Sequence, residues 1–315
     1  MSTIAPSTPR TTLPVPVRWN RPLLVLAAAM AVLSVACLVL AVADPREVLG
    51  QNAWFKPLKF SLSIGIYAVS FAWLVGLPGL RRPRLAGVAA WVTVVGLVAE
   101  IVVITWAAAA GTTSHFNVAT RLNTALWGVM AASIAAVWVM TLLVGLLVFR
   151  SPLPDRARTL ALRAGVVLGL IGMALAFLMT SPTQDQLDDH RGVVGAHAVG
   201  VADGGPGLPF LGWSTEGGDL RIPHFVGLHA LQVIPLGLLL LEVLSRRATA
   251  LRDERTRFRL VLVASLGYAA LTGLLTVQAL LGQPLLRPSP AVLTAAAVLA
   301  LAVSVPAAAT LRRAR

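Results

Sequence analysis

Long apolar runs separated by mostly short loops are the feature that most restricts the fold of this chain. A helix needs about 20 apolar residues to cross about 30 Å of hydrocarbon, and several runs reach that length. Only 12% of the residues are charged, against about a quarter in a soluble domain, so a soluble multidomain protein is excluded. We predict an all-α polytopic transmembrane helical bundle of about eight spans, at residues 23–43, 58–78, 86–109, 122–149, 160–180, 223–244, 258–281 and 290–310.

The first apolar run, 23–43, resembles a signal peptide in two respects. Arg18 and Arg21 precede it, and its end resembles a cleavage site. Its apolar stretch is longer than the roughly 7–15 residues of a signal-peptide core, so we predict a retained span. Cys37, the single cysteine, lies in this run, which excludes a disulfide framework and a CxxC site. The predicted organisation is a cytoplasmic tail, one transmembrane bundle and a basic cytoplasmic tail, at residues 1–22, 23–310 and 311–315.

Basic residues gather on one side of the predicted membrane. Both tails and the loops after the second, fourth and sixth spans are rich in arginine. The alternate loops and their flanks hold fewer basic residues: Arg46, Lys56, Lys59, Arg121, Arg191, Arg221 and Arg287. The positive-inside rule then places both termini in the cytoplasm, in a multi-pass protein of the bacterial cytoplasmic (inner) membrane. The same rule accounts for the net charge of +13 without a nucleic-acid partner.

One connection, residues 181–222, is much longer than the others and falls on the predicted outer side. It is rich in Gly, Pro and Asp. Loops beyond about 15 residues are usually functional or disordered. The apolar stretches "GVVGAHAVGV" and "LPFLGW" within it predict a segment that packs over the bundle.

The unusual polar stretches also fall on the predicted outer side. They are "NAWFKPLKF" at 52–60, "GTTSHFN" at 111–117 and "GDLRIPHFVGLHALQ" at 218–232. All 5 histidines lie at this end of the predicted bundle: His115, His190, His197, His224 and His229. The sequence therefore predicts a polar site at the outer end of the spans.

Three polar residues lie deep in predicted spans. At 1.5 Å per residue, Glu100 and Gln232 lie roughly 13 Å below the outer boundary, and His229 roughly 9 Å below it. An ionisable residue at this depth is expected to be functional and to face the bundle interior. We predict catalytic roles for Glu100 and His229. The alternative for Glu100 is a protonated carboxyl that joins two helices by a hydrogen bond.

Imidazole and carboxylate groups also suggest a metal or haem site. Imidazole suits zinc, iron and copper, and the predicted metal ligands are His115, His224, His229 and Glu100. Haem b held by His115 and His229 as axial ligands is the alternative, so the cofactor stays open. His224 and His229 lie about 140° apart around an ideal helix, so a kink is needed to bring both to one site.

Four polar residues are predicted to bind a substrate that is soluble in the membrane, such as a lipid or quinone-like molecule: Lys56, Lys59, Arg221 and Gln232. The two lysines have an alternative role as interface anchors whose stems lie along apolar surface. Asp203 and Asp219 flank glycine-rich turns, so turn-forming roles account for both, and a role in the site is the alternative. Arg221 is predicted to pair with Asp219 or with a headgroup. His197 is a weaker candidate.

Three functional classes fit this arrangement. The first is a metal- or haem-dependent site that acts on a membrane-soluble substrate. The second is a proton-coupled transporter in which Glu100 carries the proton, although no inverted repeat is visible in the sequence. The third is a non-enzymatic scaffold or sensor in which residues 181–222 bind a partner. Whether the protein is an enzyme, and its oligomeric state, stay open.

Motifs between the second and sixth spans carry a resemblance. "WFKPLKF", "SHFN", "DGGPGLPFLGWS" and "GDLRIPHFVGLHALQ" resemble the recurrent motifs of bacterial multi-spanning membrane proteins that have no assigned activity. The resemblance covers roughly two-thirds of the chain and implies a multi-span fold, but it assigns no residue a role. The pattern departs from that of haem A synthase, because these histidines are not spread over alternate spans.

Overall fold

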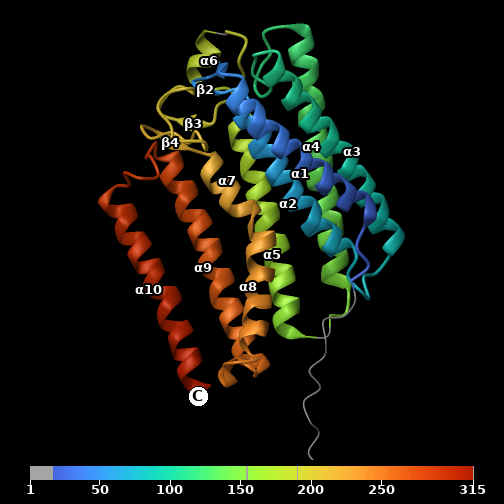
Figure 1. Ribbon diagram of the computed structural model, residues 1–315. Coiled ribbons are helices and arrows are strands. Elements are labelled where there is room, and N and C mark those ends of the chain that lie inside the picture. Colours follow the sequence, from blue (N-terminus) through green and yellow to red (C-terminus); the bar gives the residue numbers. More distant parts are fainter. Residues whose placement is uncertain (1–16, 154, 190, 315) are drawn as a thin grey trace, which may run out of the picture.

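Helices form most of the regular structure (Figure 1). The computed structural model describes residues 17–153, 155–189 and 191–314. Its α-helices are α1 (Arg21–Ala43), α2 (Phe55–Val75), α3 (Pro83–Ala109), α4 (Arg121–Arg150), α5 (Arg156–Ala174), α6 (Gln184–Asp188), α7 (Arg221–Leu228), α8 (Ala230–Leu244), α9 (Glu254–Leu280) and α10 (Pro290–Arg313). Two 3₁₀ turns add Leu175–Met179 and Thr249–Leu251.

The four short strands gather at one end of the bundle, which we call the loop end because residues 181–222 lie there (Figure 1). β1 (Glu47–Val48) and β2 (Gln51–Asn52) form a hairpin between α1 and α2. β3 (Ala198–Val199) pairs antiparallel with β4 (Gly218–Asp219), with Ala198 opposite Asp219. The opposite end, where α10 ends, is called the arginine end.

Helix boundaries follow the capping residues in the sequence. Thr120 caps α4 by accepting a hydrogen bond from the Asn123 N–H at 3.1 Å. Ser289 caps α10 in the same way, and Pro290 follows it as the first helical residue. A hydroxyl at the N-cap satisfies a free N–H, and proline has no N–H to satisfy there. These signals place the observed helix starts close to the predicted span starts.

The structure confirms an all-α architecture with several long apolar helices. Within the described residues, seven helices are long and apolar enough to cross a membrane. A further pair, α7 and α8, is bent by 42° where the helices meet. Pro235 lies inside α8, where it lacks the N–H that would bond the carbonyl one turn earlier. The arrangement is compatible with a multi-pass membrane protein.

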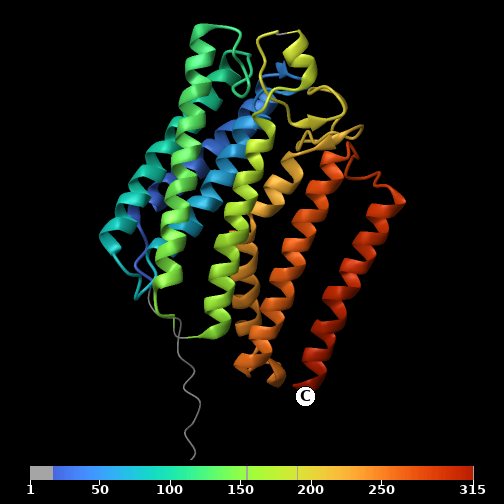
Figure 2. The ribbon, with the colours of Figure 1, turned by 180° about the vertical axis from the view of Figure 1, so that it is seen from behind.

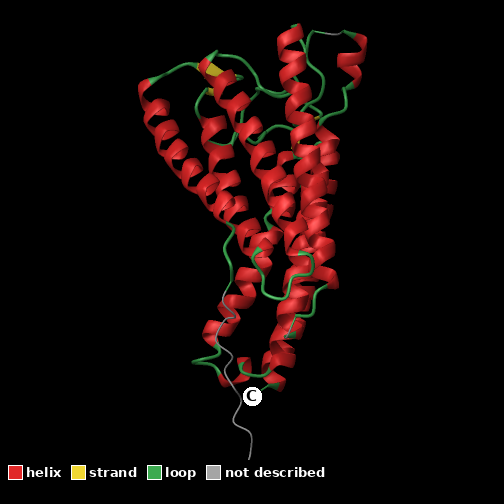
Figure 3. Cartoon of the chain, turned by 90° about the vertical axis from the view of Figure 1, so that its right-hand side faces the viewer, coloured by secondary structure: helices red, strands yellow, loops and turns green. Residues whose placement is uncertain are grey.

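α5 is the helix that joins the two halves of the bundle. α1, α2, α3 and α4 pack together on one side of it, and α7, α8 and α9 pack on the other. The two halves and α5 between them are visible from behind (Figure 2). Seen from the side, the long helices run between the two ends, and strand is visible at the end opposite to the C-terminus (Figure 3). α10 lies against α9 at the margin of the bundle.

Glycines on α5 let the bent helix pair approach closely. A Cβ at Gly172 would lie 2.0 Å from the backbone carbon of Gly227, and one at Gly165 would lie 3.1 Å from the carbonyl oxygen of Ala230. Small residues allow this kind of close packing between membrane helices. As a result α5 holds α7 and the start of α8 firmly at the loop end.

Residues of the 181–222 connection contact several other elements. Val193 forms a β-bridge with Asn117, in the connection between α3 and α4. A Cβ at Gly218 would lie 1.9 Å from the Ala279 carbonyl oxygen of α9. The connection therefore brings together polar residues from distant parts of the sequence.

Candidate functional site at the loop end

Glu100 and His115 form a buried polar contact at the loop end. Glu100 lies on α3 and is 2% exposed. His115 lies between α3 and α4, and its Nε2 is 3.5 Å from Glu100 Oε1. Its Nδ1 is 3.0 Å from the Ser114 hydroxyl. Glu100 Oε2 is buried and has no hydrogen-bond partner among the residues that the structure describes, so one half of the carboxyl group is unsatisfied.

Aromatic rings enclose the His115 imidazole. The ring centroids of Phe60 and Trp127 each lie 5.4 Å from it, and that of Phe116 lies 6.0 Å away. This burial lowers the pKa of His115 well below its usual value, and the neighbouring charge of Lys56 acts in the same direction. His115 is therefore a neutral imidazole at neutral pH, in which one ring nitrogen donates a hydrogen bond and the other accepts one.

Phe116 separates two imidazoles and has an unusual backbone conformation. Its ring centroid lies 4.8 Å from that of His197 and 6.0 Å from that of His115. Its φ is +62°, a region that bulky residues rarely occupy. Such a conformation persists only where the surrounding structure holds it, and here the buried ring packs on Trp127.

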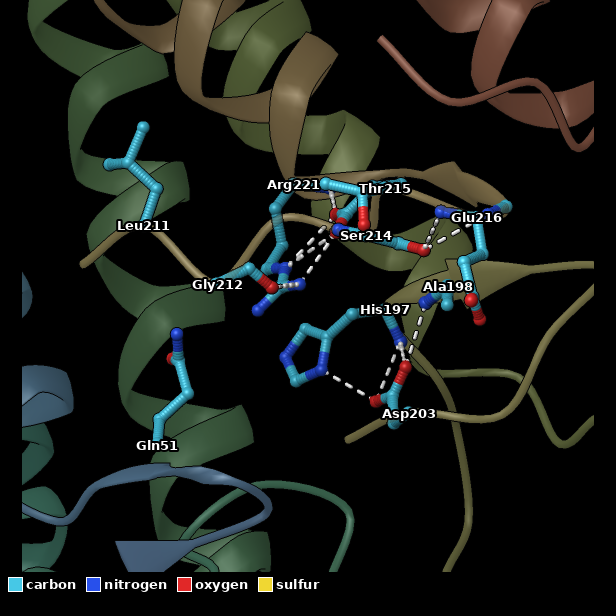
Figure 4. A network of polar contacts seen from close by, with 12 residues as sticks. Gln51, His197, Ala198, Asp203, Leu211, Gly212, Ser214, Thr215, Glu216 and Arg221 are labelled. Carbon is cyan, nitrogen blue, oxygen red and sulfur yellow. Dashed lines mark hydrogen bonds and ion pairs between the residues drawn. The ribbon is translucent and has the colours of Figure 1, made fainter. Parts of the chain in front are cut away.

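His197 and Asp203 form a second acid–base pair in the 181–222 connection (Figure 4). The Asp203 carboxylate lies 2.7 Å from His197 Nδ1 and accepts hydrogen bonds from the backbone N–H groups of His197 and Ala198. Burial acts to raise the pKa of Asp203, but these hydrogen bonds prevail and lower it to about 2. Burial also lowers the pKa of His197, against the raising influence of Asp203.

Asp219 fixes Arg221 at the start of α7. The Asp219 side chain is fully buried, and it accepts hydrogen bonds from the backbone N–H groups of Ser214 and Arg221. The Arg221 guanidinium binds the same carboxylate at 2.5 Å, and donates to the Gly212 carbonyl at 2.5 Å (Figure 4). The predicted Asp219–Arg221 pair is confirmed.

The two lysines of α2 differ in their contacts. Lys59 donates to Gln51 Oε1 at 3.2 Å and to the Leu211 carbonyl at 2.9 Å, so it ties α2 to the connection. Lys56 has no hydrogen bond to a described residue, and it interacts electrostatically with Glu100 and Arg221. The first turn of α2 has no acidic residue, so the positive end of the helix dipole adds to the charge of both lysines.

The polar residues of the bent helix pair have separate partners. His224 Nδ1 lies 2.8 Å from the Gly172 carbonyl oxygen, and His229 Nδ1 lies 3.2 Å from Gln232 Oε1. Gln232 Nε2 is buried without a partner in the described part of the chain. The break between α7 and α8 provides the kink that would be needed to bring His224 and His229 to one site. The two histidines nevertheless have different hydrogen-bond partners.

The expected metal site receives no support from the geometry. Within residues 17–153, 155–189 and 191–314, no three or more His, Cys, Asp or Glu side chains are arranged to hold a metal ion. Glu100 pairs with His115, whereas the other predicted ligands, His224 and His229, contact Gly172 and Gln232. His190 lies outside the described residues.

Comparisons of the chain with protein-family models, with curated proteins and with solved structures found no match. The chemistry of the site therefore has to be inferred from its own residues. The pairing of His197 with Asp203 is the part that the sequence did not predict. A possible signal was a histidine followed six residues later by an aspartate, with Gly200 between them as a turn residue.

Proposed function

We propose that the protein is a multi-pass protein of the bacterial cytoplasmic membrane whose loop end faces outward. We further propose that the loop-end site binds the anionic headgroup of a lipid-like molecule and takes up one proton on Glu100 as it does so. The observation that carries this proposal is the buried Glu100–His115 contact beside Lys56, a cation without a hydrogen-bonded partner among the described residues.

The charges of the site balance only when Glu100 is ionised. Its cationic side chains are Lys56, Lys59 and Arg221, and its carboxyl groups are Glu100, Asp203 and Asp219. Asp219 compensates Arg221, with which it forms an ion pair. Asp203 is hydrogen-bonded to His197, and the charge of Glu100 acts on Lys56 more strongly than that of Asp203 does. Glu100 is therefore the main compensating carboxyl group for Lys56.

An anion that binds at Lys56 compensates the positive charge of Lys56 in place of the Glu100 carboxylate. The carboxylate is then left ionised, buried and without compensation, which is unfavourable in an apolar environment. Protonation relieves this situation, so binding of the anion and of a proton are coupled. Lipids supply such anions at the membrane surface, and the long apolar helices support a position of the site near that surface.

Metal- or haem-dependent chemistry is not part of this proposal, because the described histidines have separate partners. A quinone-like ligand matches the charge of the site less well, because its neutral headgroup does not compensate the positive charge of Lys56. The geometry supports binding of an anion at Lys56 and uptake of a proton by Glu100. An amphiphile with an acidic headgroup supplies that anion.

The test is binding of dioleoylphosphatidylglycerol to the full chain in neutral detergent micelles, followed by tryptophan fluorescence. Its phosphodiester keeps a single negative charge across the pH range used, and dioleoylphosphatidylcholine is the neutral comparison. We expect Lys56→Gln to weaken binding of the anionic lipid by about 1.4–2.7 kcal/mol, or ten- to a hundredfold.

The matched control is Arg191→Gln, which removes a cation of the 181–222 connection that is 84% exposed and paired with Asp189. We expect this variant to bind like the wild type. Equal binding of the two lipids, or an equal loss in the two variants, would contradict the proposal.

A further inference from the structure

The His197–Asp203 pair has the geometry of an oriented general base. We propose that His197 activates a water molecule for hydrolysis of a phosphodiester in the headgroup of an anionic amphiphile, and that Asp203 positions it. The inference rests on the proposed function, because its substrate is the anionic headgroup that the loop-end site binds.

Asp203 fixes the proton on one side of the imidazole. Its carboxylate lies 2.7 Å from His197 Nδ1 and is itself held by the backbone N–H groups of His197 and Ala198, at 3.0 and 2.8 Å. A carboxylate at Nδ1 keeps the proton there and leaves the Nε2 lone pair free to accept another. Nε2 has no hydrogen bond to a described residue, and the side chain is 18% exposed.

Charged and polar groups lie near this imidazole. The Arg221 guanidinium, the His197 ring and the Gln51 amide are turned toward a common space (Figure 4). The charges of Arg221 and Lys56 act on His197 directly. A planar guanidinium suits phosphate oxygens, so these groups favour a phosphate ester over a neutral carboxylic ester.

His197 is suited to act as a base near neutral pH. Burial keeps its pKa below the usual value, so the ring is unprotonated there. It makes no hydrogen bond to a Ser, Thr or Cys side chain in the described part of the chain, and water is therefore the nucleophile.

The reaction is a simple hydrolysis. The oxygen of water forms a bond to phosphorus as the bond from phosphorus to the leaving alcohol oxygen breaks. His197 Nε2 takes the proton of the attacking water, and the leaving alkoxide takes a proton from solvent. His197 then releases its proton, and the products are a phosphate monoester and an alcohol.

The test uses decyl 4-nitrophenyl phosphate, an anionic amphiphile whose cleavage releases coloured nitrophenolate, with the full chain in neutral detergent micelles. We expect the wild type to release nitrophenolate and His197→Gln to lower kcat by about 10²- to 10⁴-fold, the usual contribution of a general base. An unchanged circular dichroism spectrum of His197→Gln shows that the variant is folded. Binding of phosphatidylglycerol by the wild type in the same micelles separates this inference from the proposed function.

Asp203→Asn provides a second variant with a different readout. Activity should fall at acid pH as His197 becomes protonated, and Asp203 raises the pKa of His197. Removing its charge should therefore move the acid limb of the pH profile to lower pH. The matched control is Asp189→Asn, which neutralises an exposed carboxylate of the same connection and should leave the profile unchanged.

Three results would overturn the inference. The first is a wild-type rate no greater than that of buffer, while phosphatidylglycerol still binds. The second is full activity in His197→Gln. The third is an unmoved acid limb in Asp203→Asn, which would give Asp203 a structural role only.

Discussion

Asp219→Asn tests whether the loop end is held by a buried ion pair. The carboxylate accepts hydrogen bonds from the Ser214 and Arg221 backbone N–H groups and from the Arg221 guanidinium, and its side chain has no exposed surface. Removing one partner of a buried pair costs about 3–5 kcal/mol. Arg221 is 28% exposed, so solvent screens part of the loss and we expect the lower end, about 3 kcal/mol.

Hydrogen–deuterium exchange of peptides that cover residues 206–221 measures this loss as a local opening. A change of about 3 kcal/mol corresponds to exchange that is roughly a hundredfold faster. Asp189→Asn is the control, because its partner Arg191 is exposed and such surface pairs contribute about 0–1 kcal/mol. If residues 206–221 exchange at the same rate in both variants, Asp219 does not hold the connection in place. The proposed geometry of the site would then be wrong.

Two further predictions concern stability. The pKa values of His115 and His197 lie below the usual 6.5 in the folded chain, so the folded state binds fewer protons than the unfolded state. The contribution of these two histidines to stability should therefore be constant above about pH 6.5 and fall as pH decreases, by up to about 1.4 kcal/mol per pH unit for each histidine. Thermal unfolding across pH, compared with His115→Gln, checks this, and an unchanged pH dependence in the variant refutes it for His115. Gly172→Ala places a Cβ 2.0 Å from the Gly227 backbone and should lower the unfolding free energy by about 1–3 kcal/mol or more. Gly128→Ala meets nothing within 4 Å and should leave the melting temperature unchanged or raised, so equal melting temperatures in the two variants would contradict the close packing of α5 on α7.

Much of the helical architecture was predictable because apolar length and capping residues act locally. The predicted span 122–149 is observed as Arg121–Arg150, where Thr120 caps the helix. The sixth span was predicted as one helix, but the structure breaks it into α7 and α8. Gly172 approaches Gly227 closely just before the break, and a contact between two distant segments has no local signal.

The sequence predicted most residues of the candidate site, but it predicted fewer of the contacts between them. Depth alone identified Glu100 as a buried ionisable group, and the structure adds its contact with His115. His224 and His229 shared the predicted location, but each is bound to a partner of its own. The His197–Asp203 pair depends on the path of an irregular loop, for which residue periodicity provides no information.

The central claim, that Glu100 exchanges a proton when an anion binds, is tested most directly by the pH dependence of phosphatidylglycerol binding. One proton taken up per lipid predicts an affinity that rises tenfold, about 1.4 kcal/mol, for each unit that pH falls, over the pH range in which Glu100 is ionised in the lipid-free protein. Glu100→Gln removes the exchangeable proton and should bind the lipid with an affinity independent of pH. A pH-independent affinity in the wild type, or the same slope in Glu100→Gln, would contradict the account.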